Sequence, residues 1–202
     1  MTKSELRKIY FARRQALSAE ELAENSRQIA HRFFEDIDLT TIKTIHTFIA
    51  IEKFNEIDTS VIYTRIWLDF PQIRTIAPLA NLDSGVMEHF ELGAGTGLIE
   101  SRWGIREPVG GESVDAVEID LVLVPLLCFD ERGSRVGYGK GFYDRLLSRC
   151  RADCLKVGLS HFPQVEVIDD LNDYDVPLDA CITPERIYQT KKGGSADRKS
   201  VV

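Results

Sequence analysis

The stretch Ile119-Asp-Leu-Val-Leu-Val-Pro125 decides the fold of this 202-residue chain. After Asp120 it is continuously apolar and β-forming, which predicts a strand covered on both faces, as in a parallel sheet. Further extended runs lie at 44–51, 73–79, 156–159 and 180–183, and helical patterns separate them. Strands that alternate with helices predict an α/β fold: a single domain with an open, mostly parallel sheet and helices on both faces, in a Rossmann-like three-layer arrangement.

Two helices are expected at the start of the chain. Thr2 with Glu5, and Ser18 with Glu21, have the form of capping boxes, and apolar residues recur at helical spacing behind each pair. Later helical patterns surround Ile62 and Leu146. The glycine-rich region 80–111 is irregular and is interpreted as a hairpin-like excursion with loops.

Composition is that of an ordinary globular protein, with 44% hydrophobic and 28% charged residues. We expect one domain over residues 1–188 and a disordered basic tail over 189–202. The four cysteines include no Cys-x-x-Cys pair, so reduced thiols in a cytoplasmic protein are expected.

The net charge of −7 argues against a general nucleic-acid binder, because a polyanion would be repelled over most of the surface. No signal-peptide pattern opens the chain. Its longest uncharged apolar run, Leu121 to Phe129, is too short to cross a bilayer. We therefore expect a cytoplasmic monomer with no membrane and no nucleic acid among its partners.

The densest candidate site is the stretch Arg135-Val-Gly-Tyr-Gly-Lys-Gly-Phe-Tyr-Asp-Arg145, between the buried strand and a helix. Ligands of open α/β sheets bind at the carboxyl ends of strands, where this loop would emerge. Gly137, Gly139 and Gly141 alternate, so backbone N–H groups can approach an anion closely. The loop is not a Walker A motif, because Lys140 is followed by glycine, and it lacks the last glycine of the dinucleotide fingerprint.

Two interpretations of this stretch stay open from the residues alone. Arg135, Lys140 and Arg145 are expected to be catalytic cations, and Asp144 is a candidate ligand for Mg²⁺ shared with nucleotide phosphates. The competing interpretation is a tight turn with surface cations, in which Asp144 stabilises a helix N-terminus or pairs with Arg145.

Each of the other candidate site residues has a weaker sequence signal than the glycine loop. Lys3 and Arg7 project from one side of the first helix, which is ordinarily a solvated face. Glu56 follows a strand and is open to ligand binding, whereas Asp58 fits a helix cap. Trp103-Gly-Ile-Arg-Glu-Pro108 is interpreted as a rigid packing loop. The histidines show no liganding spacing, and no zinc site or acyl-enzyme nucleophile is inferred.

Taken in order, five blocks resemble the 5-formyltetrahydrofolate cyclo-ligase family, also called 5,10-methenyltetrahydrofolate synthetase. They are Lys3–Arg7, Ile51–Thr59, Trp103–Pro108, Leu123–Asp130 and Gly133–Arg145. The resemblance implies an ATP- and Mg²⁺-dependent ring closure, in which 5-formyltetrahydrofolate gives 5,10-methenyltetrahydrofolate with release of ADP and phosphate.

The resemblance also implies roles for individual residues. Its ATP-binding positions are Lys3, Ser4, Glu5, Leu6, Arg7, Arg135, Val136, Gly137, Tyr138, Gly139, Lys140, Gly141, Phe142 and Tyr143. Its substrate-binding positions are Ile51, Glu56, Gly137, Tyr138, Gly139, Lys140 and Gly141. Asp144 and Asp179 match the magnesium carboxylates. The chain departs from the family at Tyr174-Asp175, where His-Asp is expected.

Two alternatives compete with this function. A phosphate-handling enzyme such as a sugar-phosphate isomerase would use the same anion-binding loop without ATP. A non-catalytic binder of folate or nucleotide would hold a ligand without releasing phosphate.

Overall fold

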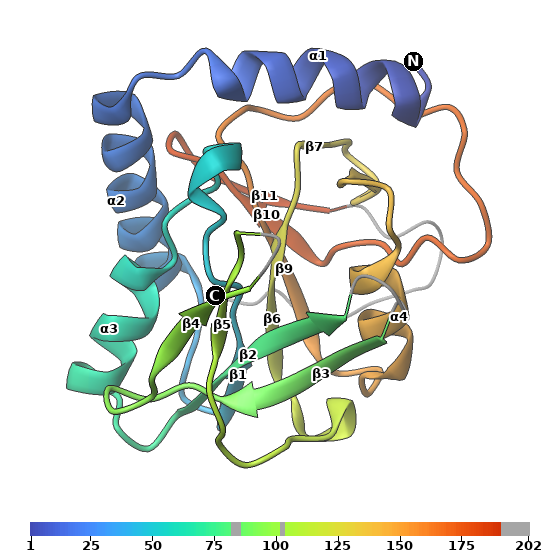
Figure 1. Cartoon of the computed structure of the whole chain (residues 1–202). Helices are drawn as coiled ribbons and strands as arrows, with labels where there is room; N and C mark the ends of the chain where they lie inside the picture. Colours follow the sequence, from blue (N-terminus) through green and yellow to red (C-terminus); the bar gives the residue numbers. More distant parts are fainter. Residues whose placement is uncertain (82–85, 102–103, 191–202) are drawn as a thin grey trace.

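The computed structural model describes residues 1–81, 86–101 and 104–190. A seven-stranded sheet with the order β11-β10-β9-β6-β1-β2-β3 forms its centre (Figure 1). The strands are β1 (Thr44–His46), β2 (Arg74–Asn81), β3 (Val86–Glu91), β6 (Leu121–Pro125), β9 (Leu155–Leu159), β10 (Ala180–Ile182) and β11 (Ile187–Gln189). The five inner strands are parallel, and the edge strands β3 and β11 are antiparallel to their neighbours. The predicted mostly parallel sheet is confirmed.

Strand β6 lies at the centre because both of its faces are apolar. Leu121 and Leu123 belong to one hydrophobic cluster, whereas Val122 and Val124 belong to another. All four side chains are fully buried. Successive residues of a strand point to opposite faces, so this run fills two cores at once.

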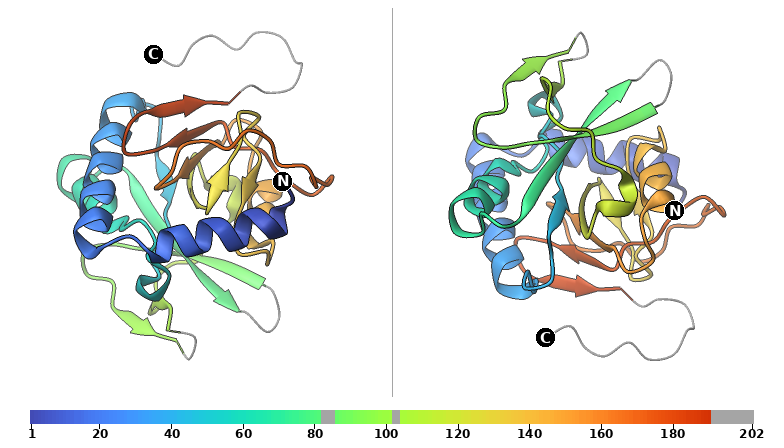
Figure 2. Two further views of the ribbon diagram at one scale, coloured as in Figure 1. Left: turned by 90° about the horizontal axis from the view of Figure 1, so that it is seen from above. Right: turned by 90° about the horizontal axis from the view of Figure 1, so that it is seen from below.

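Helices cover both faces, as expected of three layers. They are α1 (Lys3–Gln15), α2 (Ala19–Asp36), α3 (Ser60–Asp69) and α4 (Phe142–Arg149), with 3-10 turns η1 (Glu52–Phe54) and η2 (Ala116–Glu118). Helices α2 and α3 pack on the Leu121 side, and α4 and η2 pack on the Val122 side. Helix α1 lies across the carboxyl ends of the parallel strands, seen from above in Figure 2. Both predicted capping boxes, at Thr2 and Ser18, are present.

The first strand is shorter than predicted, because β1 ends at His46 and not at residue 51. The Thr47 N–H still bonds the Ile76 carbonyl, at 2.8 Å. The Phe48 carbonyl accepts from the Thr47 and Thr59 hydroxyls, and Phe48 is not part of the β1–β2 ladder. Residues 48–51 therefore turn away from the sheet and lead into η1.

The region 80–111 contains two hairpins. Strands β2 and β3 form an antiparallel ladder from Ile76↔Glu91 to Asn81↔Val86, and β4 (Leu98–Glu100) pairs with β5 (Arg106–Pro108). A third small hairpin joins β7 (Cys128–Phe129) to β8 (Arg135–Val136) around the turn predicted after Phe129.

At the end of the described chain, Gln189 still pairs in β11, and the Thr190 hydroxyl donates to the Asp179 carbonyl. The first two residues of the predicted tail therefore belong to the fold. The rest of that tail, 191–202, lies outside the described residues. Among the helices described, none is both long and apolar enough to cross a membrane.

Close packing around β9 gives a stability prediction. A Cβ added at Gly158 would lie 2.6 Å from Leu178 Cδ1 and 2.7 Å from Leu126 Cδ2. Gly158→Ala is therefore expected to lower the free energy of unfolding by about 1–3 kcal/mol, as overpacking does. Urea unfolding of both proteins would measure it. Gly95→Ala is the control, because nothing lies within 4 Å of its Cβ position. Equal midpoints for Gly158→Ala and wild type would contradict the prediction.

Candidate active site

A cavity of about 1050 Å³ opens at the carboxyl ends of the parallel strands. Pro125 at the end of β6, Phe48 after β1 and Pro78 in β2 contribute to its lining. Most of the predicted site residues line it as well. They are Lys3, Arg7, Ile51, Glu56, Arg135, Val136, Gly137, Tyr138, Gly139, Lys140, Gly141, Phe142, Tyr143, Asp144 and Arg145.

Two walls of different chemistry face this cavity. The cationic wall comes from α1, β8, the glycine loop and α4, and its cations are Lys3, Arg7, Arg135, Lys140 and Arg145. The apolar wall comes from residues 48–54 and from β2, β3 and the segment that includes β5. Its apolar side chains are Phe48, Ile49, Ile51, Phe54, Pro78, Ala80, Met87 and Ile105. The cavity therefore suits a ligand or ligand pair with one anionic part and one flat apolar part.

The glycine loop is held against α1 by backbone geometry that needs glycine. Gly139 has φ +84°, and a Cβ there would lie 3.1 Å from a terminal nitrogen of Arg7. The Arg7 Nε donates to the Gly137 carbonyl at 2.8 Å. Gly141, at φ +67°, is the N-cap of α4. Arg7 thus lies directly on the loop, and its ATP-binding role stays a prediction.

A buried polar network joins the two walls. The Tyr138 hydroxyl donates to Glu56 Oε1 at 2.6 Å and accepts from a terminal nitrogen of Arg14. Glu56 Oε2 accepts from the Ile51 N–H at 2.9 Å. Arg14 is 3% exposed and Glu56 is 8% exposed, so these contacts are shielded from water. Arg14 was missed from the sequence, although it lies two helical turns after Arg7 and hence on nearly the same face.

Burial sets the proton affinities of this network. Burial raises the pKa of Glu56, and the hydrogen bonds from Tyr138 and Ile51 and the charge of Arg14 only partly offset it. Burial, together with the nearby Glu56 charge, also raises the pKa of Tyr138. The tyrosine therefore stays a neutral donor, and burial disfavours the ionised form of Glu56 relative to a carboxyl group in water.

Asp144 pairs with Arg135 and not with Arg145. The Arg135 terminal nitrogen lies 2.6 Å from Asp144 Oδ1, which also accepts from the Val176 N–H at 3.2 Å. Burial lowers the pKa of Arg135, and the charge of Asp144 opposes that shift. Arg145 donates to the Lys140 carbonyl at 3.1 Å and lies over the Phe142 ring. Asp144 Oδ2 accepts no hydrogen bond from the described residues.

The remaining cations differ in their partners. Lys3 pairs with Asp175, whose neighbour Tyr174 also lines the cavity. Lys140 is exposed and has no ion-pair partner in the described parts of the chain. The Tyr143 hydroxyl is buried and finds no hydrogen-bond partner among described atoms.

Four predicted positions do not line the cavity. Ser4 and Glu5 are exposed, and Glu5 completes the capping box of α1. Leu6 is buried in a cluster with Val136 and two other residues. Asp179 accepts from the Lys156 N–H at 2.8 Å, so the geometry gives its predicted metal role no support. Among the described residues, no three His, Cys, Asp or Glu side chains gather as a metal site. The predicted motif residue Trp103 lies outside those residues.

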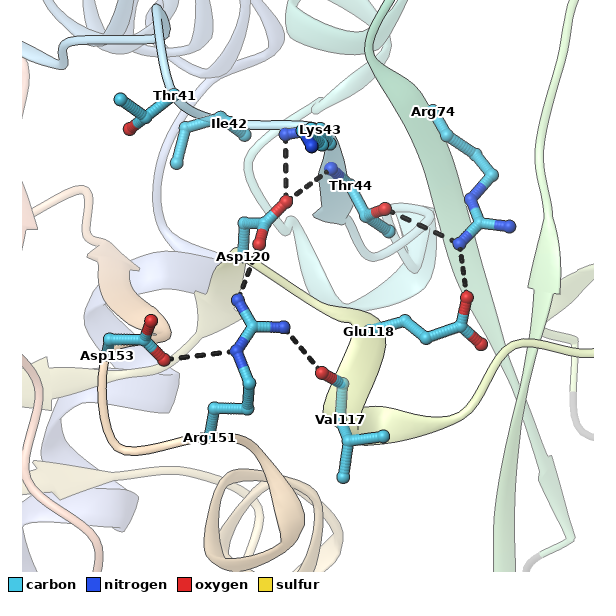
Figure 3. A pocket seen from close by; sticks show the side chains of 10 residues that line it. All are labelled: Thr41, Ile42, Lys43, Thr44, Arg74, Val117, Glu118, Asp120, Arg151 and Asp153. Atoms are coloured by element: carbon cyan, nitrogen blue, oxygen red, sulfur yellow. Dashed lines mark hydrogen bonds and ion pairs between the residues drawn. The ribbon is translucent and has the colours of Figure 1, made fainter.

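A second cavity, of about 760 Å³, lies at the opposite, amino ends of the strands (Figure 3). Most of its charged side chains, though not that of Lys43, are already engaged with one another. Asp120 accepts from the Thr44 N–H and from Arg151, and Arg74 lies 2.9 Å from Glu118. Because these groups satisfy each other, the cavity at the carboxyl ends is the candidate active site.

The raised pKa of Glu56 gives a pH prediction. The folded chain binds this proton more tightly than the unfolded chain, whose carboxyl has the ordinary pKa of 4.5. Wild type is therefore expected to lose stability relative to Glu56→Gln as pH rises from below 4.5 through the folded-state pKa. Urea unfolding at pH 4 to 8 would measure the difference, and Glu112→Gln, at an exposed position, is the control. A difference that stays constant over this range would refute the prediction.

Known proteins that are similar to this chain carry the name of one family. The model of the 5-formyltetrahydrofolate cyclo-ligase family matches residues 1–184. The 5-formyltetrahydrofolate cyclo-ligase of Escherichia coli K12 is 27% identical over 180 residues, covering 88% of this chain and 97% of that protein. The solved structure of Aquifex aeolicus 5,10-methenyltetrahydrofolate synthetase matches with TM-score 0.79 and 29% identity, covering 98% and 97% of the two chains. That of the Mycoplasma pneumoniae 5,10-methenyltetrahydrofolate synthetase matches with TM-score 0.73 and 25% identity, covering 92% and 100%. The chain therefore belongs to the 5-formyltetrahydrofolate cyclo-ligase family and is an enzyme of the ligase class.

Proposed function

We propose that this enzyme uses ATP and Mg²⁺ to close 5-formyltetrahydrofolate to 5,10-methenyltetrahydrofolate, with release of ADP and phosphate. The observation that carries the proposal is the union of a cationic glycine loop and an apolar wall in one cavity. A triphosphate fits the first wall and a reduced pterin fits the second. Both substrates are small molecules, in keeping with the family.

The chemistry needs charge neutralisation more than a protein nucleophile. A formamide oxygen is a poor leaving group, so the γ-phosphoryl group is first transferred to that oxygen and ADP departs. The neighbouring folate nitrogen, which does not carry the formyl group, then attacks the activated carbon. This nitrogen loses its proton, and phosphate leaves with the formyl oxygen. Phosphoryl transfer depends on positioning and electrostatic stabilisation, which loop N–H groups and fixed cations supply.

The cations differ in how they would act. Arg7 and Arg135 are fixed by the Gly137 carbonyl and by Asp144, so they would hold the nucleotide in a constant position. Lys140 is exposed at the tip of the loop and has no ion-pair partner among the described residues. It is therefore the cation best able to follow the charge that moves to the transferred phosphoryl group.

The residues fit a magnesium ion carried by the nucleotide phosphates. Such an ion needs only one or two protein carboxylates and supplies charge neutralisation when bound. Asp144 would hold it through Oδ2, because Oδ1 is engaged by Arg135 and the Val176 N–H.

The apolar wall distinguishes this function from a sugar-phosphate isomerase. Phe48, Phe54 and Ile51 offer a sugar nothing to hydrogen-bond through their side chains, whereas a pterin and an aminobenzoyl ring would bury apolar area there. The direct test mixes the full chain with 5-formyltetrahydrofolate and MgATP and follows the near-ultraviolet absorbance of the methenyl product. Product is expected only in the complete mixture. Phosphate release is assayed in parallel, because a non-catalytic binder would bind without releasing it.

Replacing Lys140 tests the role of the loop. Lys140→Ala is expected to raise the barrier by on the order of 3 kcal/mol, about a hundredfold in turnover, like the loss of one preorganised charge donor. Steady-state turnover with MgATP measures it. Lys8→Ala is the matched control, because Lys8 is an exposed cation of α1 that does not line the cavity. Near-native turnover of Lys140→Ala would remove this residue from the proposed mechanism.

A further inference from the structure

One carboxylate in the cavity has no role in the chemistry above. Glu107 lies in β5, is 8% exposed and lines the same cavity as Glu56. The wall around it includes Ile105, Pro78 and Ala80, and β5 packs against β2. The motif that contains Glu107 was interpreted from sequence as packing, but a carboxylate buried beside a cavity needs a further explanation.

Few partners satisfy this carboxylate. No ion pair to Glu107 exists in the described part of the chain, and its neighbour Arg106 pairs with Glu52 at 2.5 Å. Burial raises the pKa of Glu107, and the Ala80 N–H offsets that shift only in part. An ionised carboxylate can accept about four hydrogen bonds, so acceptor capacity remains toward the cavity.

We propose that Glu107 binds the amino-pyrimidinone edge of the reduced pterin, through the 2-amino group and the adjacent ring N3–H. This inference rests on the proposed function. Two neighbouring N–H donors match the two oxygens of a carboxylate, in the same fork geometry that an arginine guanidinium offers. The ring faces then contact apolar lining such as Pro78 and Ile105.

Glu56 is less suited to this role, because both of its oxygens are engaged inside the protein. Tyr138 donates to Oε1 and the Ile51 N–H donates to Oε2. The adenine of ATP is also a poorer match for Glu107. Its base-pairing edge places a ring-nitrogen acceptor beside the amino donor, and that acceptor would face a carboxylate oxygen. The complementary donor pair belongs to the pterin.

The structure supplies rigid support for this contact. Strand β5 pairs with β4 over three residues, with Glu107 opposite Ile99. Pro108, which follows, is buried and has a fixed φ. Glu107 is thus a binding residue that sets which heterocycle the apolar wall accepts, and it takes no part in phosphoryl transfer.

The first experiment measures binding without turnover. Titration calorimetry of the full chain with 5-formyltetrahydrofolate, in the absence of ATP, is expected to show about 10- to 100-fold weaker binding for Glu107→Gln, as for loss of a charged hydrogen bond. The amide replaces one of the two acceptors with a donor, which would oppose either the 2-amino group or N3–H. Glu100→Gln is the matched control, since Glu100 lies on the paired strand β4 and is exposed. The KM for ATP should stay within twofold in both variants.

The second experiment separates recognition from a structural role. A folate analogue without the 2-amino group should bind wild type about 10-fold more weakly than 5-formyltetrahydrofolate, whereas Glu107→Gln should discriminate less than threefold. A purely structural role would weaken both ligands equally. Thermal unfolding shows whether Glu107→Gln folds. If it does not, the ratio of wild-type affinities for 5-formyltetrahydrofolate and for the analogue is the test of the pterin contact.

The outcomes distinguish failure of the Glu107–pterin contact from failure of the proposed function. Wild type that forms methenyl product but binds the two ligands equally, or a folded Glu107→Gln that binds folate as wild type does, would overturn the pterin contact and leave the proposed function standing. Wild type that neither binds nor converts 5-formyltetrahydrofolate would remove both.

Discussion

The active-site cavity depends on the attachment of α1 to segments far along the chain. Arg7 bonds the Gly137 carbonyl, Arg14 bonds the Tyr138 hydroxyl and Lys3 pairs with Asp175. These cations come from one helix, and they hold the glycine loop and the segment before β10 in place. Without the helix, the Gly137 carbonyl would lose its Arg7 donor, Tyr138 would lose Arg14, and Asp175 would lose its ion-pair partner. The shape of the cavity therefore depends on the position of α1.

The sequence predicts most of the sheet because local pattern and burial agree there. The apolar run of β6 needs two covered faces, and only a central parallel strand provides them. The end of β1 was not predictable, because the Thr59 hydroxyl takes the Phe48 carbonyl from outside the strand. The glycine loop was predicted from the sequence because Gly137, Gly139 and Gly141 alternate with other residues. Arg14 was not, because an arginine in an amphipathic helix is usually exposed and only tertiary contacts bury this one.

The two glutamates that line the cavity, Glu56 and Glu107, illustrate the same limit. Glu56 and Glu107 are equally buried, yet one is satisfied within the protein and the other retains acceptor capacity. Sequence spacing cannot separate them, since the donors come from Tyr138 and Ile51 in one case and from Ala80 in the other. Asp144 shows the reverse, because the competing pairing with its sequence neighbour Arg145 is replaced by a contact with Arg135. Acidic residues that look alike in the sequence therefore differ in their hydrogen-bond donors, and these donors are known only from the three-dimensional structure.

The packing of Leu6 constrains the order in which parts of this protein can fold during synthesis. Leu6 is buried with Cys128, Val136 and Ile168. When α1 leaves the exit tunnel, none of these partners has been translated, so the helix must wait while most of the nascent chain follows it. Loop closure over such a span is slow compared with helix formation. Docking of the first helix therefore has to follow the synthesis of residues 128–168, which supply its packing partners.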